Sequence, residues 1–208
     1  MKLYLTKTPK IIQQFFKNYF WRFSTDKKEI YLTFDDGPTP EITNWTLDVL
    51  KQYHAKATFF CIGKNVLAEP EIYNRILEEE HQIGNHTHNH KKGSRTKTKV
   101  YIENVLLAEK LLQNKAKLFR PPYGKIKRSQ AKKLRNLGYK IIMWDVLSAD
   151  FDTRISNQKC LENVLKNTSN GSIIVFHDSV KAAEKLKYVL PKVLEYYSKK
   201  GVAFKAIA

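Results

Sequence analysis

Short apolar segments that favour β-strands alternate with segments of helical periodicity from residue 29 to the end of the sequence. Parallel strands need a long connection, usually a helix, so this alternation is typical of parallel strands with crossover helices. The expected strands are residues 29–35, 57–62, 83–86, 118–120, 140–145, 172–177 and 202–207. About seven such runs predict an α/β fold of the (β/α) barrel type.

The helical segments between these strands have apolar residues on one face. The expected helices are residues 42–53, 71–81, 100–115, 129–137, 158–167 and 181–200, the last interrupted at Pro191. No internal repeat, low-complexity tract or Pro/Gly/Ser-rich linker divides this region. We therefore expect one catalytic domain over residues 28–208, preceded by a separate segment of residues 1–27.

Residues 1–27 form a basic amphipathic segment. Its apolar residues recur at helical spacing: Ile11, Ile12, Phe15, Phe16, Tyr19 and Phe20. We favour packing of this helix on the domain over attachment to a membrane surface. The segment lacks the continuous apolar region and cleavage site of a signal peptide, and no run of 18 apolar residues predicts a transmembrane helix. Location therefore stays open between the cytoplasm and the membrane or cell wall.

The formal net charge of +17 favours polyanionic surroundings. No helix-turn-helix, finger or ribonucleoprotein signature accompanies the charge, so we expect no specific nucleic-acid partner and only weak contact with anionic surfaces. Cys61 and Cys160 lie far apart in apolar segments and are expected to be buried thiols. We expect a monomer.

Two adjacent carboxylates, Asp35 and Asp36, follow the first apolar strand and precede Gly37-Pro38. Successive strand residues point to opposite faces, so the two side chains diverge unless the strand ends there, as Gly-Pro indicates. One carboxylate could then bind a metal while the other acts as a base. Taken alone, this stretch is also typical of an Asx turn that ends a strand.

His86 and His90 stand four residues apart, one helical turn, so both imidazoles can meet one ion while His88 points elsewhere. Two histidines and a carboxylate leave coordination sites open, as in catalytic zinc centres. A chance cluster of solvated or core histidines is the alternative. Polar residues follow five of the expected strands, and in a (β/α) barrel this edge carries the active site.

Five motifs in this sequence resemble, in order and approximate spacing, those of the polysaccharide deacetylases, carbohydrate esterase family four, or NodB-homology domain. They are Thr33–Pro38, His86-Thr87 with His90, Arg120–Gly124, the segment from Trp144 and Asp145 to Asp150, and Val175–His177. The resemblance covers about residues 28–207. It implies a distorted (β/α) barrel and a metal-dependent hydrolase that removes acetyl groups from sugars.

The resemblance also implies roles for the first motifs. Asp36, His86 and His90 would bind the metal, usually Zn²⁺, with Co²⁺ or Ni²⁺ as other candidates. Asp35 would be the general base. Arg120 would hold Asp35 by a charge-assisted hydrogen bond.

The later motifs would supply the proton donor and the substrate contacts. His177 would be the general acid and Asp150 its partner, while the backbone N–H of Tyr123 would help to stabilise the oxyanion. Val175 would line a pocket for the acetyl methyl group, and Phe151 would form an aromatic wall of the groove.

The fourth motif departs from the family pattern. Its common form is Asp-x-x-Asp-Trp, whereas this sequence has Leu147-Ser148-Ala149-Asp150-Phe151, which lacks the first carboxylate and the indole N–H. Asp145 could compensate for the missing carboxylate, or it could simply cap a loop.

The substrate implied is an N-acetylglucosamine-containing glycan, either peptidoglycan or a chitin-like oligomer. Two alternatives remain open: a catalytically impaired glycan-binding protein of the same fold, and a deacetylase of O-acetylated sugars such as xylan.

Overall fold

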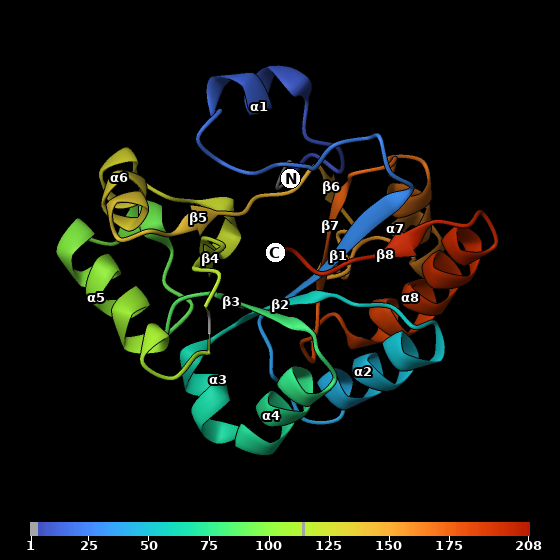
Figure 1. Ribbon diagram of the computed structural model, residues 1–208, viewed down its shortest axis with the longest axis horizontal. Coiled ribbons are helices and arrows are strands. Elements are labelled where there is room, and N and C mark those ends of the chain that lie inside the picture. The colour runs from blue at the N-terminus through green and yellow to red at the C-terminus, as the bar shows by residue number, and fades with distance from the viewer. Residues whose placement is uncertain (1–3, 114) are drawn as a thin grey trace.

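The computed structural model describes residues 4–113 and 115–208 and shows one curved parallel sheet with helices packed outside it (Figure 1). The strands are β1 Glu29–Asp35, β2 Thr58–Cys61, β3 Gln82–Asn85, β4 Leu118–Phe119, β5 Lys140–Ile141, β6 Val146–Leu147, β7 Ile173–His177 and β8 Ala203–Phe204. Their order is β5-β4-β3-β2-β1-β7-β6, with β8 paired to β1, and every pair is parallel. The predicted distorted (β/α) barrel is confirmed.

Helices connect the strands and form the outer layer (Figure 1). They are α1 Lys10–Phe15, α2 Ile42–Gln52, α3 Gly63–Ala68, α4 Pro70–Glu78, α5 Thr98–Glu109, α6 Arg128–Asn136, α7 Asn157–Leu165 and α8 Ala183–Ser198, with short 3₁₀ turns at Gly93–Arg95 and Pro122–Gly124. Helix α1 stands apart from the others at one end of the molecule. The predicted helix over residues 100–115 instead begins at Thr98 and ends at Glu109; residue 114 lies outside the described residues.

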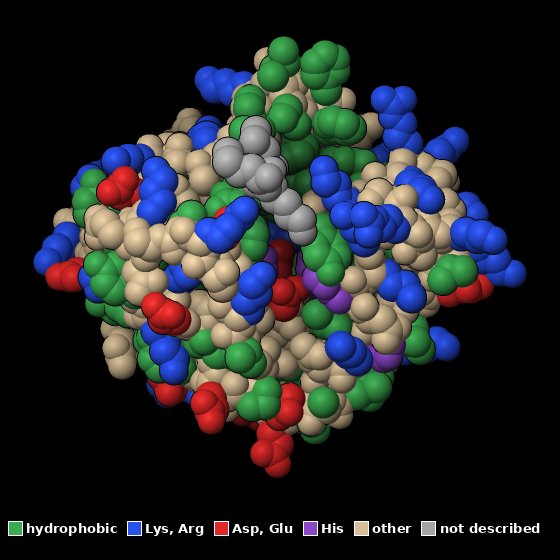
Figure 2. All heavy atoms as spheres, turned by 180° about the vertical axis from the view of Figure 1, so that it is seen from behind, with side chains coloured by type: hydrophobic (Ala, Val, Ile, Leu, Met, Phe, Trp, Pro, Cys, Tyr) green, Lys and Arg blue, Asp and Glu red, His purple; other side chains and the backbone are tan. Residues whose placement is uncertain are grey.

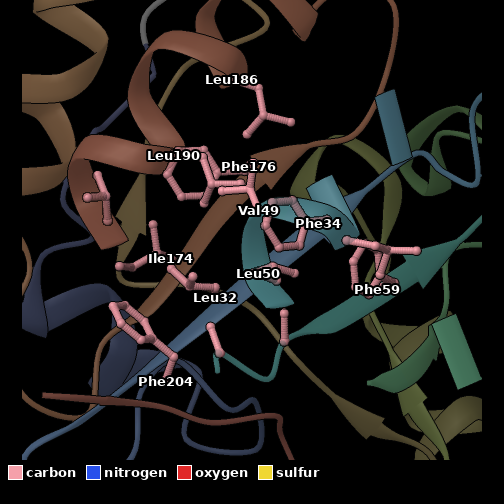
Figure 3. Close-up of a cluster of buried hydrophobic side chains, with 14 of the residues drawn as sticks. Leu32, Phe34, Val49, Leu50, Phe59, Ile174, Phe176, Leu186, Leu190 and Phe204 are labelled. Carbon is pink, nitrogen blue, oxygen red and sulfur yellow. The ribbon is translucent and has the colours of Figure 1, made fainter. Parts of the chain in front are cut away.

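The main core lies between the outer face of the sheet and helices α2, α7 and α8 (Figure 3). Phe34 is fully buried, and its ring centroid lies 5.0 Å from that of Phe59 and 5.9 Å from that of Phe176. Because side chains alternate along a strand, burial of Phe34 and Phe176 outside turns Asp35 and His177 toward the barrel interior. The burial of the apolar residues of β1 and β7 therefore determines the direction in which Asp35 and His177 point.

The N-terminal segment fills the seam between β5 and β6, which are the ends of the sheet order. Lys7 forms an antiparallel bridge with Val146, and Phe20 a parallel bridge with Ile142. The N–H of Leu147 donates to the Thr6 carbonyl at 2.9 Å. Residues 4–22 thus satisfy edge groups that an open sheet would leave unpaired. The division into residues 1–27 and 28–208 stays a proposal.

The prediction of one strand over residues 140–145 is wrong, because β5 ends at Ile141 and the next strand, β6, begins only at Val146. Between them, the carbonyls of Ile142 and Met143 accept hydrogen bonds from the Arg120 guanidinium at 3.3 and 3.0 Å. The Met143 N–H donates to the Phe20 carbonyl at 2.7 Å. These carbonyls bind a side chain inside the barrel instead of continuing a strand ladder.

The predicted interruption at Pro191 is also wrong, since α8 continues from Ala183 to Ser198 with Pro191 inside it. Proline removes one helical N–H, but α8 is held by buried Leu190 and Val193 on either side of it. Sequence reasoning missed α3, and it placed the end of the N-terminal helix at residue 20, whereas α1 ends at Phe15.

Candidate active site and metal centre

Asp35 and Asp36 diverge at the end of β1. Asp35 keeps strand geometry and lies 4% exposed inside the barrel, whereas Asp36 has a φ of 82° in the left-handed region. Asn65 fixes this turn by donating from Nδ2 to the Asp36 carbonyl at 2.7 Å. Two neighbouring carboxylates are therefore presented in different directions.

Asp36, His86 and His90 form a cluster in which the possible ligand atoms lie within 4.8 Å of one another. Asp36 Oδ1 lies 3.1 Å from His90 Nε2 and 3.6 Å from His86 Nε2. This oxygen is buried, and no donor in the described chain forms a hydrogen bond of good geometry to it. A buried carboxylate oxygen without a donor is costly, and a cation between these three groups would satisfy it.

The tautomer and charge of His86 also suit a metal ligand. Its Nδ1–H donates to the Arg120 carbonyl at 2.8 Å, which leaves the Nε2 lone pair facing Asp36. Burial lowers the pKa of His86 to about 4, so the imidazole is neutral. Although burial opposes it, the imidazoles of His90, His177 and His86 hold the pKa of Asp36 below its usual range. The donor set therefore fits a divalent metal with open coordination positions.

The loop that carries His86 and His90 is not helical, which corrects the expected i, i+4 geometry. Thr87 and His90 have φ values of 64° and 51°, and these left-handed residues turn both rings to one side. Asn104 Oδ1 accepts two successive backbone N–H groups of the loop, at 3.1 and 3.0 Å. Helix α5 thus holds the loop through an asparagine that the sequence analysis did not single out.

His88 points away from the cluster, as predicted, and packs against α3 and α5. A Cβ at Gly63 would lie 2.6 Å from His88 Nδ1 and 3.0 Å from Ala108 Cα. Only glycine fits at this close approach.

Arg120 follows β4 directly, is fully buried in the barrel, and contacts residues of β1 and β2. Its Nη1 donates to Asp35 Oδ1 and to Thr33 Oγ1, both at 2.7 Å. The guanidinium carbon lies 4.1 Å from the centroid of the Phe60 ring. Burial lowers the pKa of Arg120, with Asp35 opposing this effect. The buried pair thus leaves little rotational freedom to Asp35.

His177, at the end of β7, is paired with Asp150. His177 Nδ1 lies 2.7 Å from Asp150 Oδ1, and the His177 backbone N–H donates to Oδ2 at 2.7 Å. Burial alone would lower the pKa of His177, but the charge and hydrogen bond of Asp150, together with Asp36 and Asp35, raise it to about 10. Nδ1 is occupied by Asp150, so Nε2 is left for a substrate.

Aromatic side chains line both sides of this arrangement. The Phe151 ring lies edge-on to His177, with 5.1 Å between the centroids, and the Tyr4 ring packs against Phe151 with 5.6 Å between the centroids. On the opposite side, Tyr123 is 60% exposed, has a φ of 60° and packs against His90 at 4.6 Å. Figure 2 shows purple histidine and red acidic side chains in a hollow near the centre of this face, with green hydrophobic side chains at its edge.

Val175 and Asp145 lie at different places along β7: Val175 is two residues from His177, whereas Asp145 contacts the start of the strand. Val175 is 1% exposed and, two residues before His177 on β7, lies on the same face of the sheet. Asp145 accepts from Lys7, Ser172 Oγ and the Ile173 N–H at 2.8, 3.1 and 3.1 Å. It is a structural cap and does not replace the carboxylate absent at Leu147.

Asp178 is a buried residue that the sequence analysis did not single out, although its position after His177 was a signal. Its carboxylate accepts from the Gly37 N–H at 3.1 Å and from Thr43 Oγ1 at 2.7 Å. Burial, with a further contribution from Asp36, raises the pKa of Asp178 to about 8. Asp178 therefore ties the turn after Asp36 to the end of β7.

Comparisons with known proteins agree with this geometry. A family model described as polysaccharide deacetylase matches residues 23–142. The chain is 34% identical over 192 residues to a peptidoglycan-N-acetylglucosamine deacetylase of Bacillus cereus, a match covering 90% of each protein. It is 32% identical to a chitooligosaccharide deacetylase of Bradyrhizobium, covering 76% of this chain and 74% of that protein. The peptidoglycan-N-acetylglucosamine deacetylase PgdA of Listeria monocytogenes is longer, and the match spans 32% of it.

Solved structures show the same likeness. A crystal structure of the Bc1960 peptidoglycan N-acetylglucosamine deacetylase, in complex with 4-naphthalen-1-yl-N-oxidanyl-benzamide, matches with a TM-score of 0.85 and 32% identity. That match covers 96% of this chain and 95% of the other. The peptidoglycan deacetylase PdaC of Bacillus subtilis matches with a TM-score of 0.77 and 28% identity over 89% of this chain and 90% of the other.

Proposed function

Because the chain belongs to the polysaccharide deacetylase family, we propose that it hydrolyses the acetamido group of N-acetylglucosamine units in a glycan and releases acetate. The observation that carries the proposal is the cluster of Asp36, His86 and His90 beside the Asp35–Arg120 pair. Peptidoglycan is the leading substrate, because several relatives are named for it. A chitin-like oligomer is the second.

Asp36, His86 and His90 would hold a divalent metal, and Zn²⁺ fits two imidazoles and one carboxylate best. Co²⁺ and Ni²⁺ accept the same donors. When bound, the ion supplies a Lewis acid that polarises the acetyl carbonyl and makes a water more acidic.

Asp35 is the proposed general base. Its carboxylate would take a proton from the attacking water while the water oxygen bonds to the acetyl carbon. The hydrogen bond from Arg120 keeps the carboxylate oriented during this transfer. Arg120 does not contact the reacting atoms and acts by positioning Asp35.

His177 is the proposed general acid, with Asp150 as its partner. Its raised pKa keeps the imidazole protonated near neutral pH, so Nε2 can donate to the leaving nitrogen as the C–N bond breaks. The products are acetate and a free amine on the sugar. The Tyr123 backbone N–H would stabilise the oxyanion, Val175 would contact the acetyl methyl group, and Phe151 would line the groove.

The proposal is tested by acetate release from N-acetylglucosamine oligomers and from peptidoglycan, after chelation and again after addition of Zn²⁺. Asp35→Asn should lower kcat by at least about 100-fold, and His86→Ala should abolish zinc-dependent activity. Asp26→Asn and His54→Asn change the same residue types on the exposed surface and should leave activity unchanged.

Unchanged rates in Asp35→Asn and His86→Ala would overturn the assignment. Zinc and glycan binding without acetate release would show a glycan-binding protein, and release only from acetylated xylan would show an O-deacetylase.

A further inference from the structure

Helix α1 and the turn after it expose an unusual amount of apolar surface. The exposed fractions are 60% for Ile11, 78% for Phe15, 41% for Phe16 and 41% for Phe20. We call these four side chains the α1 apolar patch. No residue of α1 itself is buried, and Figure 2 shows apolar side chains gathered on the protrusion at the top of the molecule. Soluble proteins seldom expose several large apolar side chains together unless they form an interaction surface.

The backbone beneath the patch is firmly attached. The Phe20 N–H donates to the Ile141 carbonyl at 2.8 Å, and the Thr8 N–H donates to the Asp145 carbonyl at the same distance. Trp21 is 9% exposed and belongs to a cluster of buried side chains that includes Phe119 and Leu134. Its indole N–H donates to the Phe16 carbonyl at 3.1 Å. The segment is therefore held at both ends while its apolar side chains face outward.

All the charged side chains of the segment that carries the patch are basic. Residues 4–25 contain no Asp or Glu, and their basic residues are Lys7, Lys10, Lys17 and Arg22. Lys10, Lys17 and Arg22 line one shallow hollow together with Phe20. Lys10 and Lys17 are exposed, whereas Lys7 is committed to Asp145. The surface therefore combines exposed apolar side chains with positively charged side chains beside them.

We propose that the α1 apolar patch docks on the surface of an anionic lipid bilayer, with Phe15 and Ile11 inserted at the headgroup boundary and Lys10 and Lys17 contacting anionic headgroups. Apolar side chains with flanking lysines are the chemistry of interfacial helices, and each basic residue near an anionic surface adds attraction. No helix in residues 4–113 or 115–208 is long and apolar enough to cross a bilayer, so the contact proposed is with the surface.

Charge decides against a second copy of the chain as the occupant. A twofold dimer would bring the same patch, with its own lysines, against itself. Like charges would then face each other on molecules that each carry a formal charge of +17. An anionic glycan could pair its charges with Lys10 and Lys17, but it has no apolar interior in which Phe15 could be buried. A bilayer surface satisfies both.

The test is co-sedimentation of the full chain with phosphatidylcholine vesicles and with vesicles that also contain phosphatidylglycerol. We expect binding to the anionic vesicles, at least about tenfold weaker in Ile11→Ser/Phe15→Ser and weaker in Lys10→Glu/Lys17→Glu. Phe15→Trp keeps an apolar side chain and should retain binding, with a blue shift of its emission. Circular dichroism and Tm confirm that each variant is folded.

Matched controls alter exposed residues elsewhere. Leu67→Ser/Leu107→Ser removes apolar side chains that are 59% and 44% exposed, and Lys51→Glu/Lys64→Glu removes the same charge as the α1 charge variant. The apolar control should keep wild-type binding, and Lys51→Glu/Lys64→Glu should weaken binding less than Lys10→Glu/Lys17→Glu. Deacetylation of a soluble oligomer should be unchanged in Ile11→Ser/Phe15→Ser.

Three outcomes would overturn the proposal. Absence of vesicle binding would do so, as would binding that Ile11→Ser/Phe15→Ser leaves intact, because adsorption would then be electrostatic alone. A dimer in light scattering that this variant dissociates, without vesicle binding, would assign the patch to a second copy.

Discussion

Three residues at the site, Asp36, His90 and Tyr123, have left-handed backbone, with φ values of 82°, 51° and 60°. Residues other than glycine seldom adopt such angles, and the strain persists only where neighbours hold the backbone. For Asp36 the neighbours are Asn65, which binds its carbonyl, and Asp178, which binds the next N–H. Sequence patterns pointed to these three residues as site residues, but not to Asn65 and Asp178, which hold the turn at Asp36.

Asp178 is therefore predicted to be a positioning residue for the metal centre. Asp178→Ala leaves the buried Gly37 N–H and Thr43 hydroxyl without their acceptor, which should weaken zinc binding by about 10- to 100-fold and lower kcat. Asp178→Asn keeps an acceptor and should retain most of both. Zinc competition titration and kcat measure the effects, with Tm as the control for folding. Equal zinc affinity in wild type and Asp178→Ala would contradict the role.

His81 is a buried histidine away from the site and predicts a pH dependence of stability. Its exposed fraction is 6%, and its Nδ1 accepts from the Ala57 N–H at 3.2 Å. Burial, with Lys56 adding to the effect, lowers its pKa to about 4. Below about pH 6.5, His81 is protonated in the unfolded chain but stays neutral in the folded chain until the pH approaches 4. The free energy of unfolding therefore decreases as the pH falls from 6.5 toward 4.

The predicted size of this loss is about 2 kcal/mol between about pH 7.5 and pH 5. His81→Gln keeps an acceptor but cannot titrate, so its free energy of unfolding should fall less over that interval. Urea denaturation at each pH measures the difference. His54→Asn, at an exposed histidine whose φ is 49°, should follow the wild type. Parallel curves for His81→Gln and wild type would refute the assignment.

At the scale of elements, the sequence was informative wherever a strand buries one face fully. β1 was predicted over the residues where it is found, because apolar side chains alternate up to Asp35. β5 was predicted too long, to Asp145, and β6 was not predicted, because periodicity cannot show that the carbonyls of Ile142 and Met143 accept hydrogen bonds from Arg120. The segment from His86 to His90 was predicted to be helical from the spacing of its histidines. It is a loop, because Asn104 of α5 binds its backbone N–H groups, and the sequence pattern does not show this contact.

The attachment of residues 4–8 to β6 carries a prediction of its own. Lys7 Nζ donates to Asp145 Oδ2 at 2.8 Å and to the Asn167 carbonyl at 2.6 Å. Lys7→Met leaves the buried carboxylate without its cation, which should cost about 1 to 2 kcal/mol of unfolding free energy because the lysine is partly exposed to water.

A double-mutant cycle with Asp145→Asn measures the coupling, and the double variant should recover part of the loss. Lys166→Met breaks an exposed i, i+4 pair with Glu162 and should change stability by no more than about 0.5 kcal/mol. A similar small change in Lys7→Met would show that the N-terminal attachment does not depend on this ion pair.

At the scale of the whole molecule, the charge of +17 did not constrain the fold but does bear on the substrate. Lys92 lies at the edge of the groove, with its ammonium 5.6 Å from the centroid of the Tyr123 ring. A cation at this distance from an exposed aromatic ring can attract a carboxylate-bearing glycan without taking part in hydrolysis.

Salt should therefore separate two substrate classes. Raising NaCl from about 50 to 500 mM shortens the range of electrostatic attraction to a few ångströms, so kcat/KM on an anionic glycan should fall several-fold. A neutral N-acetylglucosamine oligomer should show little change, and it controls for effects of salt on the fold. Lys92→Gln should reduce the salt dependence for the anionic glycan more than Lys64→Gln, which changes an exposed lysine on α3. Equal salt dependence for both substrates would mean that the positive surface does not attract the substrate and serves another partner.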